Sequence, residues 1–192
     1  MGRVISGQWR GLRLDCLEGQ RTRPTSDRCK EALFSMIQAD LFDARFLDLF
    51  AGTGQIGIEA LSRQAQFAAF VEGGKEAQRV LQKNLDRCQI PKEKGRLYRQ
   101  TVEAFLRKNQ EDAFDIIFAD PPYDLAWAWF ESAWETLLST DYLKAGGLLI
   151  LESAAKDEAR LTAFLQAHAG EAEVLKSCRY GAALLSFWRS KN

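Results

Sequence analysis

The chain contains only one histidine, His168, and its four cysteines form no C-x-x-C pair. A structural zinc site needs several clustered Cys or His ligands, so the sequence predicts no metal site. The cysteines lie far apart, at positions 16, 29, 88 and 178, which is typical of proteins kept in a reducing cytoplasm. His168 follows an apolar helical pattern, and we interpret it as a residue at a helix end rather than a catalytic residue.

Long apolar runs are also missing. The longest, such as GLLIL at 147–151, are far too short to cross a bilayer. The first ten residues, MGRVISGQWR, contain no apolar signal core. The hydrophobic content of 46% and the charged content of 27% are those of an ordinary soluble globular protein. We therefore predict a cytoplasmic protein without a membrane partner.

The formal net charge is zero, but the charges are distributed unevenly. Residues 1–30 hold seven Arg and Lys against three acids, a net charge of +4, and the rest of the chain carries −4. A basic segment on a mildly acidic body indicates a polyanionic partner that is contacted at one end. A solvated surface hairpin explains the same charges equally well, so composition leaves both interpretations open.

Strands and helices alternate along most of the chain. Residues 3–16 predict a short hairpin around glycine turns, and residues 25–41 predict a helix capped by Thr25 or Ser26. The predicted strands are 46–50, 67–72, 95–100, 114–120 and 147–152, and the helices between and after them are 56–63, 75–88, 103–109, 127–138 and 157–167. A terminal hairpin turns at Tyr180-Gly181. This order predicts an α/β protein with a mostly parallel sheet, in which ligands bind beyond the carboxyl ends of the strands.

The first strand of this pattern ends in a glycine loop, DLFAGTGQIG. Gly52, Gly54 and Gly57 form a G-x-G-x-x-G spacing that opens a helix, and Glu72 ends the next strand. An acid at that place accepts hydrogen bonds from ribose hydroxyls, as in dinucleotide-binding proteins. S-adenosylmethionine also carries an adenosine, so it fits the same pattern. Asp48 favours S-adenosylmethionine, because a carboxylate suits a cationic amino group and repels a pyrophosphate.

The strand at 114–120 ends in Asp-Pro-Pro-Tyr, which contains two of the four prolines of the chain. An exocyclic amine of a nucleobase is a poor nucleophile because its lone pair is delocalised into the ring. The Asp120 carboxylate and the Pro121 carbonyl are two acceptors that orient such an amine, and the two prolines stiffen the loop that holds them. Tyr123 is placed to stack on a base flipped out of its helix. The motif predicts methylation of an amine.

These segments together resemble the RsmD family of bacterial 16S ribosomal RNA (guanine-N2)-methyltransferases. The resemblance rests on RVISGQWRGLRL, TRPTSDRCKEALFSMI, LDLFAGTGQIGIEALSR and FDIIFADPPY, and it runs from Arg3 to about Glu152. It implies a Rossmann-like class I methyltransferase fold, whose seven-stranded, mostly parallel sheet has an antiparallel last strand. It also implies 16S ribosomal RNA, within an assembled or assembling small ribosomal subunit, as the substrate.

The resemblance further assigns roles to individual residues. It implies a basic hairpin and loop at 1–25 and a single compact methyltransferase domain at 26–192. In that domain Asp120, Pro121, Pro122 and Tyr123 hold the target guanine. The residues implied for S-adenosylmethionine are Asp48, Phe50, Ala51, Gly52, Thr53, Gly54, Glu72, Gln100, Thr101, Val102 and Asp120. The residues implied for RNA phosphates are Arg3, Arg10, Arg23 and Arg28.

Two points stay open at this level. The third strand ends in Gln100-Thr101-Val102, where many methyltransferases carry an acid near the adenine, so the residue that contacts the adenine is undecided. The motif itself suits other exocyclic amines, including the adenine amine in RNA or DNA. An NAD-dependent oxidoreductase would use the same glycine loop, but it leaves Asp-Pro-Pro-Tyr and the basic segment unexplained. A non-catalytic RNA-binding protein conflicts with the intact motif.

Overall fold

The structure is a computed structural model that describes residues 2–17, 27–108, 111–122 and 126–191. The chain falls into two compact units, Met1–Lys108 and Asn109–Asn192. The boundary predicted between residues 25 and 26 stays a prediction, because residues 18–26 lie outside the described part. Within the described ranges no helix is long and apolar enough to span a membrane.

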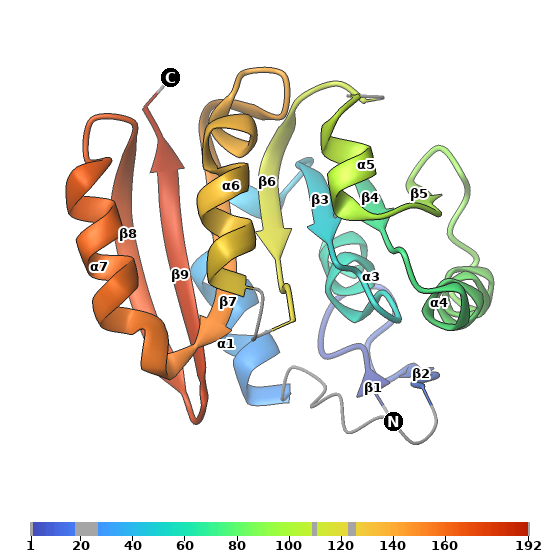
Figure 1. Ribbon diagram of the computed structural model, residues 1–192. Helices are drawn as coiled ribbons and strands as arrows, with labels where there is room; N and C mark the ends of the chain where they lie inside the picture. Colours follow the sequence, from blue (N-terminus) through green and yellow to red (C-terminus); the bar gives the residue numbers. More distant parts are fainter. Residues whose placement is uncertain (1, 18–26, 109–110, 123–125, 192) are drawn as a thin grey trace. The chain divides into compact units, whose positions relative to one another are not determined.

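The first unit begins with a small hairpin and continues with alternating helices and strands (Figure 1). The hairpin strands β1 (Gly2–Arg3) and β2 (Arg13–Leu14) pair in antiparallel register, as predicted. The remaining elements are α1 (Asp27–Met36), α2 (Gln38–Leu41), β3 (Arg45–Leu49), α3 (Gln55–Ser62), β4 (Phe67–Val71), α4 (Lys75–Arg87), β5 (Gly95–Tyr98) and α5 (Val102–Leu106). The prediction of one continuous helix at 25–41 is wrong, because Ile37 (φ −100°, ψ 10°) separates α1 from α2. Its predicted caps, Thr25 and Ser26, lie outside the described residues.

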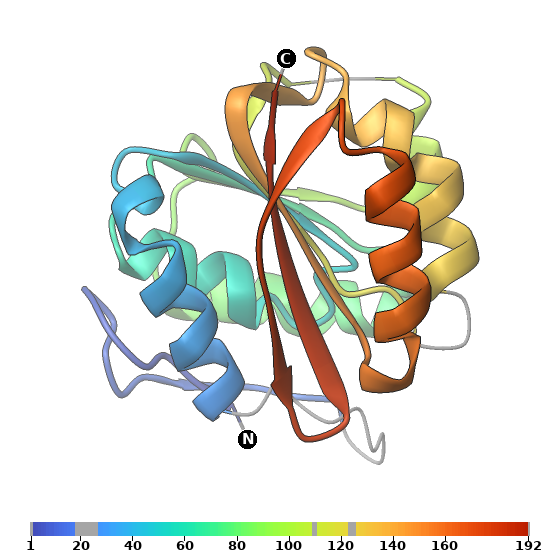
Figure 2. The same cartoon turned by 90° about the vertical axis from the view of Figure 1, so that its left-hand side faces the viewer.

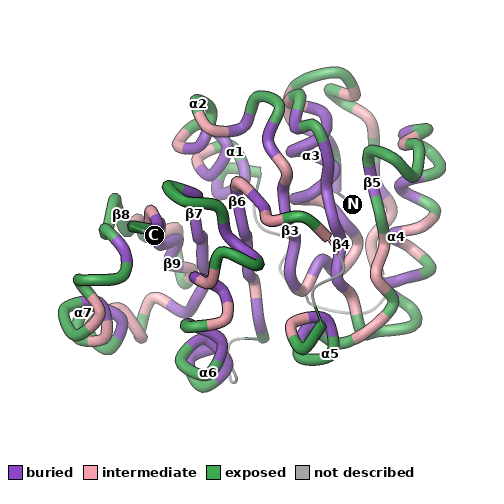
Figure 3. The backbone as a smooth tube through the Cα atoms, turned by 90° about the horizontal axis from the view of Figure 1, so that it is seen from above, coloured by how far each residue is buried: buried purple, intermediate pink, exposed green. Residues whose placement is uncertain are grey.

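The strands of the first unit are parallel and lie in the order β5-β4-β3. Every residue of β4 is buried, and so is every residue of β3 after Arg45 (Figure 3). Parallel strands covered on both faces by helices have this continuous apolar character rather than an alternating one. The predicted strand positions are therefore confirmed to within two residues. The carboxyl ends of β3 and β4 lie side by side, because Leu49 pairs with Val71. Predicted cofactor residues follow these two strand ends.

The second unit pairs strands with two helices packed on them. Its elements are β6 (Phe114–Ala119), α6 (Ala126–Leu138), β7 (Leu143–Ala154), the 3-10 turn η1 (Ala155–Asp157), α7 (Glu158–Ala167), β8 (Ala172–Tyr180) and β9 (Ala183–Ser190). Strand β7 is parallel to β6, and β9 is antiparallel to both β7 and β8. The predicted fold class is confirmed: seven strands follow the hairpin in the described chain, and they are parallel except for the last.

Aromatic side chains form the core between α6, α7 and β9. Figures 1 and 2 both place α6 and α7 on the same side of β8 and β9. Trp134 and Trp188 are almost fully buried, and the Trp134 ring lies 5.2 Å from that of Phe164. The other tryptophans of α6, Trp127 and Trp129, are buried as well, so the tryptophans of this region are core residues. His168 ends α7 and its Nδ1 lies 2.9 Å from the Phe164 carbonyl oxygen, as expected of a helix-terminal residue.

Strand β7 begins four residues earlier than predicted. The sequence predicted a strand at 147–152. In the structure Gly146 adopts a left-handed φ of 70°, and the β6–β7 register shifts between Phe114 and Ile116. Glycine tolerates this backbone conformation, so the strand passes through the irregularity instead of ending there.

Candidate functional site

The loop between β3 and α3 is built from left-handed backbone conformations. Phe50, Gly52 and Gly54 have φ values of 63°, 54° and 82°. The turn is closed by the Gly54 amide, which donates to the Ala51 carbonyl at 2.7 Å. A Cβ added at Gly52 would meet only the Phe50 carbonyl oxygen, at 3.9 Å, so this glycine borders open space. The backbone at Gly52 is therefore open to close approach by a ligand, as the sequence predicted.

The other two glycines of the motif have packing roles. A Cβ at Gly54 would come within 2.1 Å of the Leu81 side chain of α4. A Cβ at Gly57 would come within 2.3 Å of the Phe70 ring of β4. At separations this short a Cβ would force Leu81 or Phe70 to move, so these glycines let α3 lie directly against its neighbours. The G-x-G-x-x-G spacing thus combines one position that borders open space with two close-packing positions.

Asp48 is almost completely buried in β3, and its carboxylate has a partner inside the chain. Its Oδ2 accepts a hydrogen bond from the Gly57 amide, at 2.9 Å, near the start of α3. Burial is the main effect that raises the pKa of Asp48, to about 7. The Gly57 hydrogen bond lowers this pKa by a smaller amount, and the nearby negative charge of Glu72 raises it further. The carboxyl group therefore lies close to its titration point at neutral pH. Its role toward a cationic ligand stays a prediction, whereas its role in fixing α3 was not visible in the sequence.

Glu72 is held in place by the backbone on both sides. Its Oε2 accepts from the Gly52 amide at 2.7 Å, and its Oε1 accepts from the Gly74 amide at 2.6 Å. Each carboxylate oxygen has a second lone pair, so the fixed group keeps acceptor capacity for two further donors. A ribose diol offers two such donors. The structure thus fits the predicted ribose role and also links Glu72 directly to the glycine loop.

The residues that follow β5 bear on which side chain contacts the adenine. The Nε2 atom of Gln100 is buried and has no hydrogen-bond partner among the described residues. Thr101 is the N-cap of α5 and accepts from the Ala104 amide at 3.3 Å, while Val102 is buried. A buried amide without a partner costs free energy unless a ligand or water satisfies it. Gln100 therefore has unused hydrogen-bonding capacity where the sequence predicted the adenine contact, whereas the Thr101 oxygen already accepts one hydrogen bond.

The second unit carries the Asp-Pro-Pro segment directly after β6. Asp120 is half-buried and Pro121 is buried, while Pro122 is exposed. The pairing of Ala119 with Leu151 of β7 fixes the backbone just before this segment. Asp120 has contacts of its own within the chain. Tyr123 lies outside the described residues, so its predicted stacking role stays a prediction.

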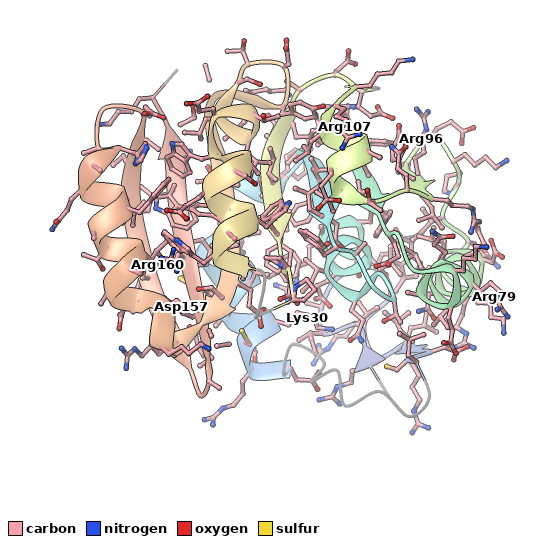
Figure 4. All side chains as sticks on the ribbon, viewed as in Figure 1. Lys30, Arg79, Arg96, Arg107, Asp157 and Arg160 are labelled. Atoms are coloured by element: carbon pink, nitrogen blue, oxygen red, sulfur yellow. The ribbon has the colours of Figure 1, made fainter. Side chains whose placement is uncertain are left out.

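The basic residues predicted for RNA differ in their surroundings. Arg10 and Arg28 are exposed, whereas the Arg3 Nε lies 3.0 Å from Asp27 Oδ2 in an ion pair at the surface. Arg23 lies outside the described residues. The same unit also exposes arginines that the sequence did not single out as RNA-binding residues. Among them are Arg79 of α4, Arg96 of β5 and Arg107 after α5 (Figure 4).

A buried charge network fixes the hairpin, and sequence reasoning missed it. Glu59 of α3 is fully buried and accepts from the Ile5 and Ser6 amides at 2.7 and 2.9 Å. Lys30 of α1, labelled in Figure 4, approaches the same carboxylate at 3.7 Å and donates to the Arg3 carbonyl at 2.5 Å. Burial lowers the pKa of Lys30, and Glu59 opposes that change. Both residues look like ordinary helix-surface charges in the sequence.

Comparison with known proteins gives consistent results along the whole chain. The family described as Conserved hypothetical protein 95 matches residues 2–189. The Ribosomal RNA small subunit methyltransferase D of Haemophilus influenzae is 37% identical over 161 residues, which make up 83% of this chain and 82% of that protein. The solved structure of a putative methyltransferase from Escherichia coli aligns with a TM-score of 0.80 at 28% identity and covers 98% of this chain and 97% of its own. A putative methylase from Haemophilus influenzae aligns with a TM-score of 0.77 at 30% identity and covers 99% and 98%.

Proposed function

The chain belongs to the Conserved hypothetical protein 95 family, the RsmD family that its motifs resemble, and on this premise we propose its reaction. We propose that it methylates ribosomal RNA of the small subunit with S-adenosylmethionine as the methyl donor. The target is the exocyclic 2-amino group of a guanine in 16S ribosomal RNA. The substrate is the small ribosomal subunit, assembled or in assembly.

The observation that carries the proposal is the set of groups around the glycine loop. Gly52 borders open space, Glu72 is fixed beside it with acceptor capacity to spare, and Gln100 has a buried amide without a partner among the described residues. These groups suit an adenosine, with the ribose hydroxyls on Glu72 and the adenine near Gln100. Asp48 adds a carboxyl that ionises near neutral pH, as a ligand with a cationic amino group requires. S-adenosylmethionine supplies both the adenosine and an activated methyl group on a sulfonium.

Asp120 and Pro121 are the residues proposed to act on the amine. Their two oxygens accept hydrogen bonds from the guanine 2-amino group and turn its lone pair out of the ring plane. As the new N–C bond forms, the S–C bond of the donor breaks, and the nitrogen releases one proton to the Asp120 carboxylate or to water. Stiff prolines keep both acceptors in place before the reaction, which is the form of electrostatic stabilisation that needs no reorganisation.

The test is methyl transfer from labelled S-adenosylmethionine to unmodified small ribosomal subunits, naked 16S ribosomal RNA and duplex DNA in parallel. We expect label on a guanine of the ribosomal RNA. In the matched variant Asp120→Asn, which keeps the size of the side chain, turnover should fall by roughly a hundredfold or more while cofactor affinity stays near that of the wild type.

Three other outcomes would contradict separate parts of the proposal. Label on an adenine would overturn the guanine target but not the chemistry. Full activity of Asp120→Asn would overturn the role of Asp120. Absence of cofactor binding by the wild-type protein would return the glycine loop to the nicotinamide alternative.

A further inference from the structure

One buried amide connects the hairpin to the glycine loop. Asn84 of α4 is fully buried, and its Nδ2 donates to the carbonyls of Asp15 and Thr53, at 3.1 and 2.9 Å. Its Oδ1 accepts from the Asp15 amide at 2.8 Å. Asp15 directly follows β2 of the hairpin, and Thr53 lies between Gly52 and Gly54. The two protons of the Asn84 amide are thus divided between two segments that are far apart in the sequence.

A second contact joins the same two segments. The Nε2 of Gln55, the first residue of α3, lies 3.6 Å from Cys16 Sγ and 3.5 Å from Thr53 Oγ1. The Gly2 amide donates to the same sulfur at 3.1 Å. Gly2 lies so close to Gln55 that an added Cβ would be 2.2 Å from its Oε1. Both ends of the hairpin therefore touch the residue that follows the glycine loop.

The hairpin is also fixed along its length by hydrogen bonds to α3 and α4. Arg87 of α4 donates to Asp15 Oδ1 at 2.8 Å and to the Arg13 carbonyl at 2.9 Å. Ser62 of α3 accepts from the Trp9 amide at 3.0 Å. Figure 1 shows β1 and β2 next to α3 and α4, the helices that supply these groups. The hairpin backbone that leads to Asn84 is therefore held at several points.

We propose that Asn84 is a positioning residue that couples the RNA-binding hairpin to the cofactor loop, so that each ligand strengthens the binding of the other. This inference rests on the proposed function. RNA that restrains the hairpin also restrains Asp15 and hence the Asn84 amide. The amide then holds the Thr53 carbonyl and the left-handed loop around it in one arrangement. A cofactor that binds a loop already ordered loses less conformational entropy, and thermodynamic linkage makes the effect reciprocal.

The test measures the dissociation constant of labelled S-adenosylhomocysteine, which binds without turnover. It is measured by equilibrium dialysis with and without saturating unmodified 16S ribosomal RNA transcript or small ribosomal subunits. For the wild type we expect RNA to tighten binding by at least about fivefold, the lower end of typical allosteric coupling. In Asn84→Asp, which keeps one acceptor and loses both donors, RNA should change the affinity by less than about twofold.

The matched control is Gln82→Ala. Gln82 also carries a side-chain amide on α4, but its partners are Asp86 and Arg99, at 3.0 and 2.9 Å, and not the hairpin or the loop. This variant should keep the full effect of RNA. Loss of the effect in Gln82→Ala, or its retention in Asn84→Asp, would overturn the role of Asn84.

A measurement on the wild type keeps the inference falsifiable if Asn84→Asp does not fold. Saturating S-adenosylhomocysteine should slow hydrogen exchange of the Asp15 amide, although Asp15 is outside the proposed cofactor site. An unchanged exchange rate, or equal affinities with and without bound RNA, would overturn the coupling and leave the proposed function intact. If the wild type binds neither S-adenosylhomocysteine nor S-adenosylmethionine, the proposed function and the coupling are overturned together.

Discussion

At the scale of single residues, Asp48 fixes the start of α3, and we propose that the same carboxyl group also binds a cationic ligand. The hydrogen bond from the Gly57 amide needs only one of its oxygens. Burial raises its pKa to about 7, so the neutral form dominates below that pH and the ionised form above it. An adjacent cation favours the ionised form. Binding of a cationic ligand is therefore linked to the loss of a proton from Asp48.

The affinity for S-adenosylmethionine should consequently depend on pH. Because the pKa of Asp48 is raised, the free protein carries a proton there below about pH 7, and this proton must leave when the cation binds. Affinity should increase between pH 5.5 and 7.5, by at most about tenfold per pH unit, and then level off. Calorimetric titrations at several pH values measure the affinity for S-adenosylmethionine.

The matched variant for this prediction is Asp48→Asn, whose side-chain oxygen still accepts from the Gly57 amide. It should bind more weakly at pH 7.5 and with little dependence on pH. A wild-type affinity that is constant from pH 5.5 to 7.5 would exclude the contact between Asp48 and the cation.

At the scale of elements, the N-terminal hairpin is part of the packed structure of its unit. Only two residues of each strand pair, which is too little for a stable independent hairpin. The Ile5 and Ser6 amides instead bind the buried Glu59 carboxylate, and Lys30 completes the network from α1. The orientation of this basic element thus depends on two buried charges that balance each other.

Replacing Lys30 by methionine should destabilise the protein by about 3 kcal/mol, because removal of one partner leaves a buried charge with less compensation. Glu59 would retain Arg63, whose Nε lies 2.8 Å from its Oε1. Urea unfolding measures the loss. The exposed Arg28→Met on the same helix is the control and should change stability by less than about 0.5 kcal/mol. A loss below 1 kcal/mol for Lys30→Met would show that the network does not hold the hairpin.

At the scale of the whole molecule, the uneven charge distribution predicts that RNA binding and cofactor binding differ in their dependence on salt. The basic excess lies in residues 1–30, and the described arginines Arg10 and Arg28 are exposed there. RNA phosphates release condensed counterions when such side chains bind them, so binding weakens as salt increases. The proposed cofactor contacts involve mainly acids and an amide. Salt should therefore weaken RNA binding far more than cofactor binding.

The double variant Arg10→Glu with Arg28→Glu should bind 16S ribosomal RNA transcript more weakly and with a flatter salt dependence. Loss of two phosphate contacts on single-stranded RNA lowers the slope of log K against log salt by roughly 1.4. Filter binding across a series of salt concentrations measures the slope. The control reverses two exposed lysines of the second unit, Lys176 and Lys191, and changes the net charge equally. Equal slopes for wild type and the Arg10/Arg28 variant would exclude phosphate contacts by these arginines.

The sequence by itself determined the order of strands and helices, the glycine loop and the position of Asp120. These features follow from local periodicity and from the backbone preferences of glycine and proline, which act over a few residues. Only the tertiary structure decided what Asp48, Glu59 and Asn84 bind. Asn84 meets Asp15 across 69 positions, and Glu59 meets Ile5 across 54. Such pairs leave no periodic signal, because the fold rather than the neighbouring sequence brings a buried polar group to its partner.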